Sequence, residues 1–272
     1  MYMDRLSAAQ VMALSRDTIV VLPLASIEQH GPHLPVGTDS FIGQGIVDLL
    51  EAECPETLLM LPMLKFGCSE HHMFFGGTLT LTHETFEQVA LEVLESMYRH
   101  GFRRFLITNS HGGNRSVGGV IAEKASIHWP DAQTIFVSWF QLAAAKLKPL
   151  VEGAYPSVGH ACEFETSVMM VLHPDLVNMK KAQDDGPASD VPPFKGDLLG
   201  GSSAAWARPF HVMTKRGVFG RPTLATPRKG KRILDVTIGE YKVMLEAAWP
   251  GSTKRHSGST AASSRRAGKS RR

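Results

Sequence analysis

The sequence predicts an α/β fold, a three-layer α/β/α sandwich in which a mostly parallel sheet lies between two layers of helices. Two observations predict it. Short apolar runs rich in β-branched residues recur along the chain, and segments with helical spacing of apolar residues separate them. Strands that alternate with helices form βαβ units, whose strands run parallel. The runs are nearly continuous in their apolar character, as expected of strands covered on both faces.

The expected strands are TIVVLPLAS (18–26), LLMLPML (58–64), RFLITNS (104–110) and TIFVSWF (134–140). The expected helices are 83–99, 115–128, 162–173 and 233–248, with one more beginning near Phe41. Gly101 supplies a C-terminal stop for the first of these helices. The stretch 182–230 is rich in Gly, Pro and Asp, and we expect a long excursion or an interface arm there rather than a second domain.

We expect a single domain over residues 1–250 and a disordered basic tail over 251–272. The tail contains seven Lys or Arg and no acid, which leaves 22 basic and 26 acidic side chains elsewhere, a net charge of −4. Such a tail could touch nucleic acid or an anionic surface. We favour a solvated or vector-derived segment and expect no nucleic-acid partner. No apolar run reaches the roughly 18 residues that span a bilayer, so no membrane partner is expected either.

The cysteines and the start of the chain predict a cytoplasmic location. Cys54, Cys68 and Cys162 are odd in number, widely spaced and without a CxxC pair, which favours reduced thiols over disulfides or cysteine-ligated zinc. The first residues contain no positively charged region followed by an apolar block, so no signal peptide is expected.

The segment SIEQHGPHLPVGTDS (26–40) carries a possible metal site. Glu28 and His30 are two residues apart, so in an extended chain they project to the same side beyond the end of a strand. Prolines and glycines then shape a turn that returns Asp39 to the same edge, where open α/β sheets bind ligands. Such a cluster suits zinc or manganese. The alternative is that the two acids are turn and cap residues with His30 hydrogen-bonded nearby.

A second candidate, His111, directly follows the strand at 104–110. Two glycines come after it and permit close approach of the backbone, and Asn114 or Ser116 is expected to cap the next helix. A histidine at this edge is again where a ligand would lie. The alternative is a histidine that fills a tight strand-to-helix turn.

The segment GHACEFETSVMM (159–170) places His160, Glu163 and Glu165 near the start of a helix. In a regular helix His160 would share a face with Glu163 and not with Glu165. If His160 precedes the first helical turn, helical spacing does not exclude a pairing of His160 with Glu165. The alternative for at least one of the glutamates is a capping role, in which its carboxylate interacts favourably with the positive end of the helix dipole. The residues alone do not choose between the two acids.

The segment FGCSEHHMFFGGTLTL (66–81) places His71 and His72 among aromatic residues and glycines. We expect a loop that faces the substrate, with His72 binding it; the alternative is a buried loop with hydrogen-bonded histidines. The basic residues of 217–232 lack a phosphate-binding fingerprint, and the chain has no G-x-S-x-G nucleophile elbow.

Five segments together resemble the creatininase family of metal-dependent amidohydrolases, in the family's order, over about residues 18–245. They are LASIEQHGPHLPVGTDS, HHMFFGGTLTL, TNSHGGN, GHACEFETS and GVFGRPTLAT. The resemblance implies one α/β/α sandwich domain with a two-metal centre, which holds two divalent ions per chain, usually zinc or manganese. The nitrogen and oxygen ligands also admit iron. It also implies a homo-oligomer, commonly a hexamer.

The resemblance also assigns roles to residues of this chain. It implies that Glu28, His30, Asp39 and His111 are metal ligands, with Asp39 bridging the two ions. It implies that Glu165 of the ETS triplet is the last ligand, a choice that we follow. His160 would be the catalytic acid/base and substrate-orienting group.

Two departures from the creatinine hydrolases argue against creatinine as the substrate. After the third strand those enzymes have a segment similar to NGHYEN, and this chain has Gly113 in place of its glutamate. Gly159 and Cys162 are also different from the residues that those enzymes have at these positions. We therefore expect hydrolysis of a non-peptide C–N bond in a small amide, cyclic amide or formamide through a metal-bridging hydroxide. The alternatives are a metallopeptidase acting on a short peptide and a catalytically silent metal-binding scaffold.

Overall fold

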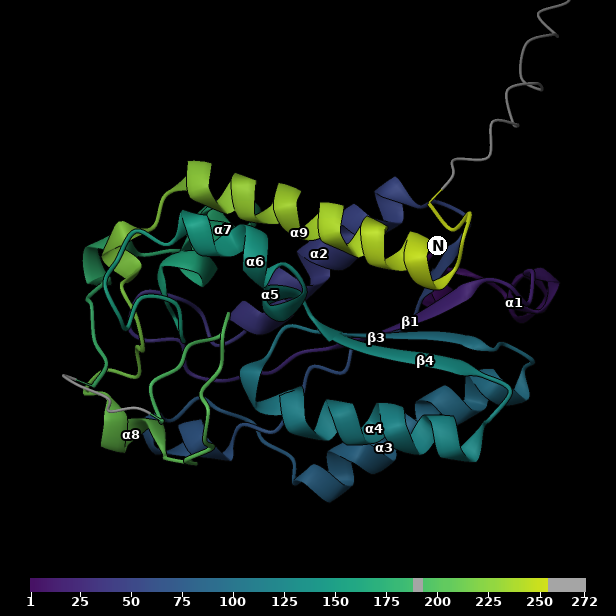
Figure 1. Ribbon diagram of the computed structural model, residues 1–272, viewed down its shortest axis with the longest axis horizontal. Coiled ribbons are helices and arrows are strands. Elements are labelled where there is room, and N and C mark those ends of the chain that lie inside the picture. The colour runs from purple at the N-terminus through teal and green to yellow at the C-terminus, as the bar shows by residue number, and fades with distance from the viewer. Residues whose placement is uncertain (188–192, 254–272) are drawn as a thin grey trace, which may run out of the picture.

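In the computed structural model, which describes residues 1–187 and 193–253, four parallel strands form a sheet with helices on both faces (Figure 1). The strands are β1 (Ile19–Leu24), β2 (Leu58–Met60), β3 (Arg104–Asn109) and β4 (Gln133–Ser138). The α-helices are α1 (Ala8–Ala13), α2 (Thr38–Glu53), α3 (His83–Arg99), α4 (Arg115–His128), α5 (Trp139–Leu142), α6 (Ala144–Leu147), α7 (Glu163–Leu172), α8 (Phe210–Met213) and α9 (Pro227–Ala248). The 3₁₀ helices are Met3–Arg5, Glu70–Phe75, Gly112–Asn114, Lys148–Leu150, Pro174–Leu176, Met179–Lys181 and Pro222–Leu224. The expected basic tail lies, from residue 254 onwards, outside the described residues.

The strand order is β2-β1-β3-β4, and every neighbouring pair is parallel. Ile19 of β1 aligns with Leu58 of β2 on one side and with Arg104 of β3 on the other. The chain therefore leaves β1 toward β2 and afterwards crosses to the opposite side of β1, so that the order reverses between β1 and β3. In open α/β sheets such a reversal opens a crevice at the C-terminal ends of the two strands.

The core lies on both faces of the sheet, which confirms the predicted sandwich. Along β1 the side chains alternate, so that Ile19 and Val21 pack in the core shared with α2, α7 and α9. Val20 and Leu22 pack on the opposite face in the core shared with α3 and α4. Figure 1 shows the same two layers, with α2, α7 and α9 on one side of the strands and α3 and α4 on the other. β1 is consequently buried along its whole length.

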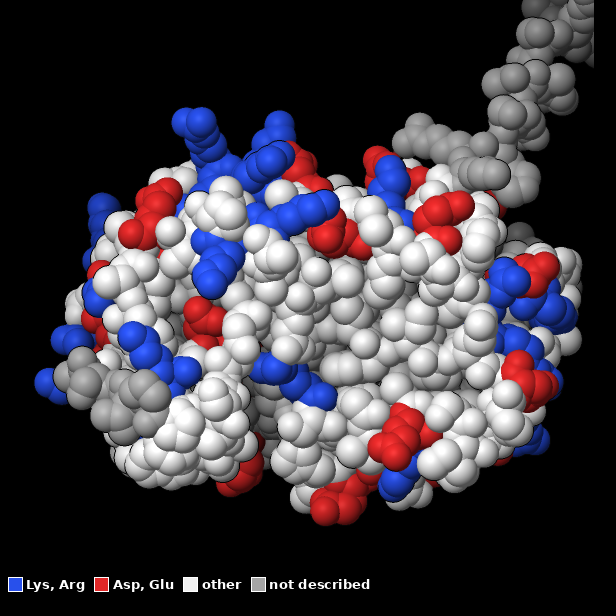
Figure 2. Space-filling model, viewed as in Figure 1, with Lys and Arg blue, Asp and Glu red and all other residues white. Residues whose placement is uncertain are grey.

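The predicted helices are confirmed, but α9 begins at Pro227 rather than at 233. Thr226 caps it by accepting a hydrogen bond from the Lys229 N–H, and a proline at the first helical position costs no hydrogen bond. The basic side chains of this first part of α9 project to solvent, apart from the buried Lys229, and Figure 2 shows them gathered at that end of the helix. In the part of the chain that the structure describes, no helix is both long and apolar enough to cross a membrane.

Asn114, one of the two predicted caps, occupies the N-cap position of α4, but its side chain does not cap the helix. Ser116 makes no side-chain cap at the start of this helix either. The Asn114 side chain instead accepts a hydrogen bond from the Cys68 N–H at 3.0 Å and donates one to the Ala25 carbonyl at 3.0 Å. A buried amide that reaches two other segments satisfies groups of those segments, and its tertiary role overrides the local capping preference.

Helices α7 and α9 pack closely, and a buried ion pair joins them. A Cβ added at Gly230 would lie 1.9 Å from the Ser167 carbonyl oxygen, so only glycine permits this approach. One residue earlier, the Lys229 ammonium pairs with the Glu163 carboxylate, which is completely buried. Glu163 also accepts a hydrogen bond from the Ser157 hydroxyl. This glutamate is thus held by α9 and the segment before α7.

The substitution Lys229→Met is expected to lower the free energy of unfolding by roughly 3–5 kcal/mol, because it leaves the Glu163 carboxylate buried without a cation. Urea denaturation of the wild type and the variant measures the change. The double variant Glu163→Gln/Lys229→Met removes both charges and is expected to recover most of the loss. A single variant as stable as the wild type would show that the pair does not hold the two helices together.

Candidate metal centre

The site lies at the C-terminal ends of β1 and β3, where the strand order reverses. After β1 the chain forms a closed loop, in which the Glu28 N–H donates to the Val36 carbonyl at 2.9 Å and Gly31 takes a positive φ of 62°. This closure brings Asp39, in the first turn of α2, back beside Glu28. His111 follows the last residue of β3 by two positions and faces the same loop.

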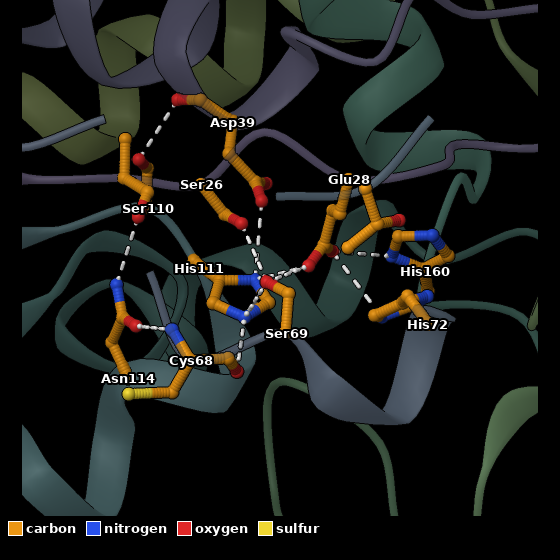
Figure 3. Close-up of polar contacts among 12 residues, drawn as sticks. Ser26, Glu28, Asp39, Cys68, Ser69, His72, Ser110, His111, Asn114 and His160 are labelled. Carbon is orange, nitrogen blue, oxygen red and sulfur yellow. Dashed lines mark hydrogen bonds and ion pairs between the residues drawn. The ribbon is translucent and has the colours of Figure 1, made fainter. Parts of the chain in front are cut away.

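Glu28 lies at the centre of the cluster (Figure 3). Its Oε2 lies 3.2 Å from His111 Nδ1 and accepts a hydrogen bond from the Ser69 hydroxyl at 2.6 Å. Its Oε1 lies 3.3 Å from His72 Nε2 and 3.4 Å from His160 Nδ1. One carboxylate thus joins the loop after β1, the segment after β3 and two further loops.

Asp39 lies between two imidazoles. Its Oδ1 is 3.5 Å from His30 Nε2, and its Oδ2 is 3.1 Å from His111 Nδ1. His30 Nδ1 lies 3.1 Å from the Glu28 carbonyl, which can only accept, so this nitrogen carries the proton. His30 Nε2, which faces the Asp39 carboxylate, is therefore the nitrogen that can bind a metal once it has lost its own proton. Metal-binding histidines commonly have this arrangement, in which the second ring nitrogen donates to a carbonyl.

The structure brings Glu165, and not Glu163, to the cluster. Helix α7 begins at Glu163, so His160 precedes the first turn and helical spacing does not govern its position. Ligand atoms of Glu165, His30 and His160 all lie within 4.8 Å of one another. Glu163 instead pairs with Lys229.

Three buried polar atoms in the cluster make no hydrogen bond with any described residue. They are Glu28 Oε1, His30 Nε2 and Asp39 Oδ2. Each of them lies 3.1–3.5 Å from a charged or titratable neighbour, but burial without a hydrogen bond is costly, and most of all for charged groups. Their nitrogen and oxygen chemistry, together with the acidity of the cluster, fits divalent zinc or manganese. Four overlapping groups have ligand atoms within 4.8 Å of one another: Glu28, His30 and Asp39; Glu28, His71 and His111; Glu28, His72 and His160; and His30, His160 and Glu165.

The protonation of the cluster without metal follows from burial and from these contacts. Burial would lower the pKa of His30, but Asp39 outweighs it and raises that pKa to about 9. Burial likewise opposes the charge on Asp39, yet His30 and His111 hold its pKa well below the usual range. Burial raises the pKa of Glu165 to about 7. The pKa of His111 is raised well above its ordinary value by Glu28 and Asp39, against the effect of burial.

His72 and His160 behave in the opposite way. Burial lowers the pKa of both imidazoles far below the ordinary value, and neighbouring histidines add to the effect. Both rings are therefore neutral at pH 7. A neutral imidazole has one N–H donor and one lone pair, so each can either give or take a proton.

A cavity of about 270 Å³ opens onto the cluster. Its lining includes Glu28, Asp39, His111, His160 and Glu165. His71 and His72 line it too, so the loop that carries them faces this cavity. Much of the remaining wall comes from residues 194–219, including the apolar side chains of Phe194, Leu198, Phe210, Met213 and Phe219.

Sequence reasoning missed three residues of the site. Ser69 binds Glu28, Gln29 contacts both His72 and His160, and Arg115 lines the cavity. Gln29 stands between two expected ligands and Arg115 directly follows HGGN, so their positions along the chain were a usable signal. Ser69 carried no local signal, because its partner Glu28 is 41 residues away.

Nearly the whole chain outside the tail is similar in sequence to known proteins. The family model described as creatinine amidohydrolase matches residues 4–243. The mycofactocin precursor peptide peptidase of Mycobacterium tuberculosis is 29% identical over 256 residues, 89% of this chain and 90% of that protein. The 3-dehydro-scyllo-inosose hydrolase of Thermotoga maritima is 27% identical, over 80% of this chain and 73% of that protein. The creatinine amidohydrolase of Pseudomonas putida is 25% identical, over 82% and 86%.

Solved structures agree in fold. A manganese form of creatininase superposes with a TM-score of 0.77 at 22% identity, over 92% of this chain and 98% of that one. A variant creatininase of a Zn–Zn type gives the same TM-score and coverage. The family match spans nearly all of the chain outside the tail, and the fold agrees with it. The chain therefore belongs to the creatininase family and is a hydrolase of that family.

Proposed function

We propose that this protein is a metal-dependent hydrolase that cleaves a non-peptide C–N bond in a small amide, cyclic amide or formamide. The observation that carries the proposal is the set of buried atoms without hydrogen-bond partners on Glu28, His30 and Asp39, which face one another beside a cavity. Buried charges of this kind are stable when they coordinate metals.

Two divalent ions, zinc or manganese, fit the donor set. Glu28, Asp39 and His111 would hold one ion, and His30, Asp39 and Glu165 the other, with Asp39 between them. Ions bound there would supply a water of lowered pKa and a Lewis acid for a substrate carbonyl. The zinc and manganese forms of creatininase support this choice of metals.

His160 is the proposed proton carrier. Its ring is neutral at pH 7, and its Nδ1 faces the Glu28 carboxylate at the wall of the cavity. It would take a proton from the attacking water at this nitrogen and give the same proton to the leaving nitrogen, so that the enzyme gains none over a turnover. His72, on the same side of Glu28, would bind the substrate.

The cavity favours a small substrate. Its volume of about 270 Å³ is just below the roughly 300–1,000 Å³ typical of ligand pockets. Its apolar wall of Phe210, Phe219 and Met213 would exclude water from the reacting bond.

A short peptide is the second candidate substrate, and Arg115 is the observation that favours it. Burial lowers the pKa of this guanidinium, and no carboxylate of the described residues forms an ion pair with it. An arginine in a cavity suits a substrate carboxylate. The relative from Mycobacterium tuberculosis is described as a peptidase. Cleavage of short peptides with a free carboxylate, but not of their amides, would favour this candidate.

The substitution Asp39→Ala is expected to remove both ions, because it takes away the group between them. Wild-type protein dialysed against metal-free buffer should retain about two transition-metal ions per chain, and the variant close to none. Elemental analysis measures both. Asp48→Ala is the matched control, since Asp48 lies on the same helix α2 and is exposed. Full metal content in Asp39→Ala would contradict the bridging role.

Metal binding is expected to release protons. His30, with its pKa of about 9, and His111 carry protons at pH 7 in the metal-free protein, and Glu165, with its pKa of about 7, is protonated about half of the time. Each of these groups must lose its proton to bind a metal, so zinc uptake should release about two to three protons. Apparent zinc affinity should therefore rise with pH up to about 9, where His30 deprotonates without help. Titration calorimetry in buffers of different ionisation enthalpy counts these protons. Zinc uptake without proton release would show that the metal does not displace protons from these residues.

The substitution His160→Ala is expected to retain both ions and to lower kcat by roughly 10²–10⁴-fold, the usual contribution of a positioned acid/base. The rate is measured on whichever member of a panel of formamides and cyclic amides the wild type hydrolyses fastest. His128→Ala, at an exposed position on α4, is the control. Retained turnover in His160→Ala would remove this residue from the chemistry.

A further inference from the structure

The two imidazoles beside Glu28 can do different chemistry only if their protons are on defined nitrogens. His160 presents Nδ1 to Glu28 Oε1, and His72 presents Nε2 to the same oxygen. Figure 3 shows both rings on one side of that carboxylate. One residue, Gln29, contacts the opposite nitrogen of each ring.

The backbone of Gln29 fixes the tautomer of His160. His160 Nε2 lies 2.6 Å from the Gln29 carbonyl oxygen. A carbonyl only accepts hydrogen bonds, so Nε2 must carry the proton. The other ring nitrogen, Nδ1, faces Glu28 Oε1 and the cavity, and it is the nitrogen that can take up a proton.

The orientation of the Gln29 amide is fixed by two other backbone groups. Its Oε1 accepts from the Gly31 N–H at 3.0 Å, and its Nε2 donates to the Gly217 carbonyl at 2.9 Å. A flipped amide would set oxygen against a carbonyl and N–H against N–H. Gly217 makes room for the amide, since a Cβ there would lie 2.0 Å from Oε1.

The second N–H of the same amide fixes His72. Gln29 Nε2 lies 2.8 Å from His72 Nδ1, which must therefore accept, so the proton of His72 is on Nε2. That N–H points to Glu28 Oε1, 3.3 Å away. The remaining contact, 3.1 Å between Gln29 Nε2 and His160 Nε2, joins two protonated nitrogens and is not a hydrogen bond.

We propose that Gln29 is a positioning residue that divides the two histidines into one proton acceptor, His160 at Nδ1, and one proton donor, His72 at Nε2. Among the described residues, Gln29 belongs neither to the lining of the cavity nor to the groups of potential metal ligands. The use of these two atoms rests on the proposed function: His160 takes the proton of the attacking water, while His72 donates a hydrogen bond to the oxygen of a bound substrate. The placement of the protons does not depend on it.

Nitrogen-15 NMR of zinc-loaded protein labelled at histidine tests the proposal. Protonated and unprotonated ring nitrogens differ widely in chemical shift, and His72→Gln and His160→Gln assign the two rings. Both rings are expected to show a protonated Nε2 and an unprotonated Nδ1 at pH 7. A proton on Nδ1 of either ring would overturn the proposal. Because no substrate is needed, this result is separate from any failure to find hydrolysis.

The variant Gln29→Met then tests the side chain. Methionine fills similar space without a donor, so His72 is expected to lose its single tautomer and show averaged shifts. His160 should keep its proton on Nε2, because its partner is the backbone carbonyl, which every variant retains. In Gln29→Glu the carboxylate accepts from His72, whose proton should move to Nδ1.

Gln88→Met, at an exposed position on α3, is the control and should change neither ring. Unchanged His72 shifts in both Gln29 variants would overturn the role of this side chain. Should a variant fail to fold, the wild-type spectrum still decides the tautomers.

Discussion

Three carboxylates buried beside one another are the constraint on which this molecule depends. Glu28, Asp39 and Glu165 are each at most 5% exposed, and they lie in one cluster at the end of a buried parallel sheet. Like charges at such distances in a dry interior oppose one another strongly, and only cations or protons can offset them. In the metal-free protein the protons of His30 and His111 offset the negative charge of the carboxylates, and divalent ions would offset more of it.

The fold explains why the acids can meet at all. The order of strands reverses between β1 and β3, so the segments that follow these strands diverge and leave a crevice between them. Glu28 and His30 come from the first segment and His111 from the second. Asp39 arrives because the loop after β1 closes back on itself, with Gly31 in a conformation that other residues adopt only with strain. Helix α7 adds Glu165 from the layer above the sheet.

Much of this could be predicted from the sequence, because the signals are local. The strands and long helices follow from apolar runs and spacing, and Glu28, His30, Asp39 and His111 follow from their places at strand ends. Local signals failed where a long-range contact decides. Asn114 looks like a helix cap but serves two distant segments instead. The choice of Glu165 over Glu163 depends on where α7 begins and on Lys229, which is 66 residues from Glu163.

The most direct test of the central claim is a crystal structure of the metal-loaded protein with anomalous difference maps collected at the absorption edge of the bound metal. Two peaks are expected, roughly 3.5–4 Å apart as in other two-metal sites. One should lie beside Glu28 and His111 and the other beside His30 and Glu165, with Asp39 between them. Peaks elsewhere, or none in a protein supplied with zinc and manganese, would contradict the claim that this buried acidic cluster is a two-metal hydrolytic centre.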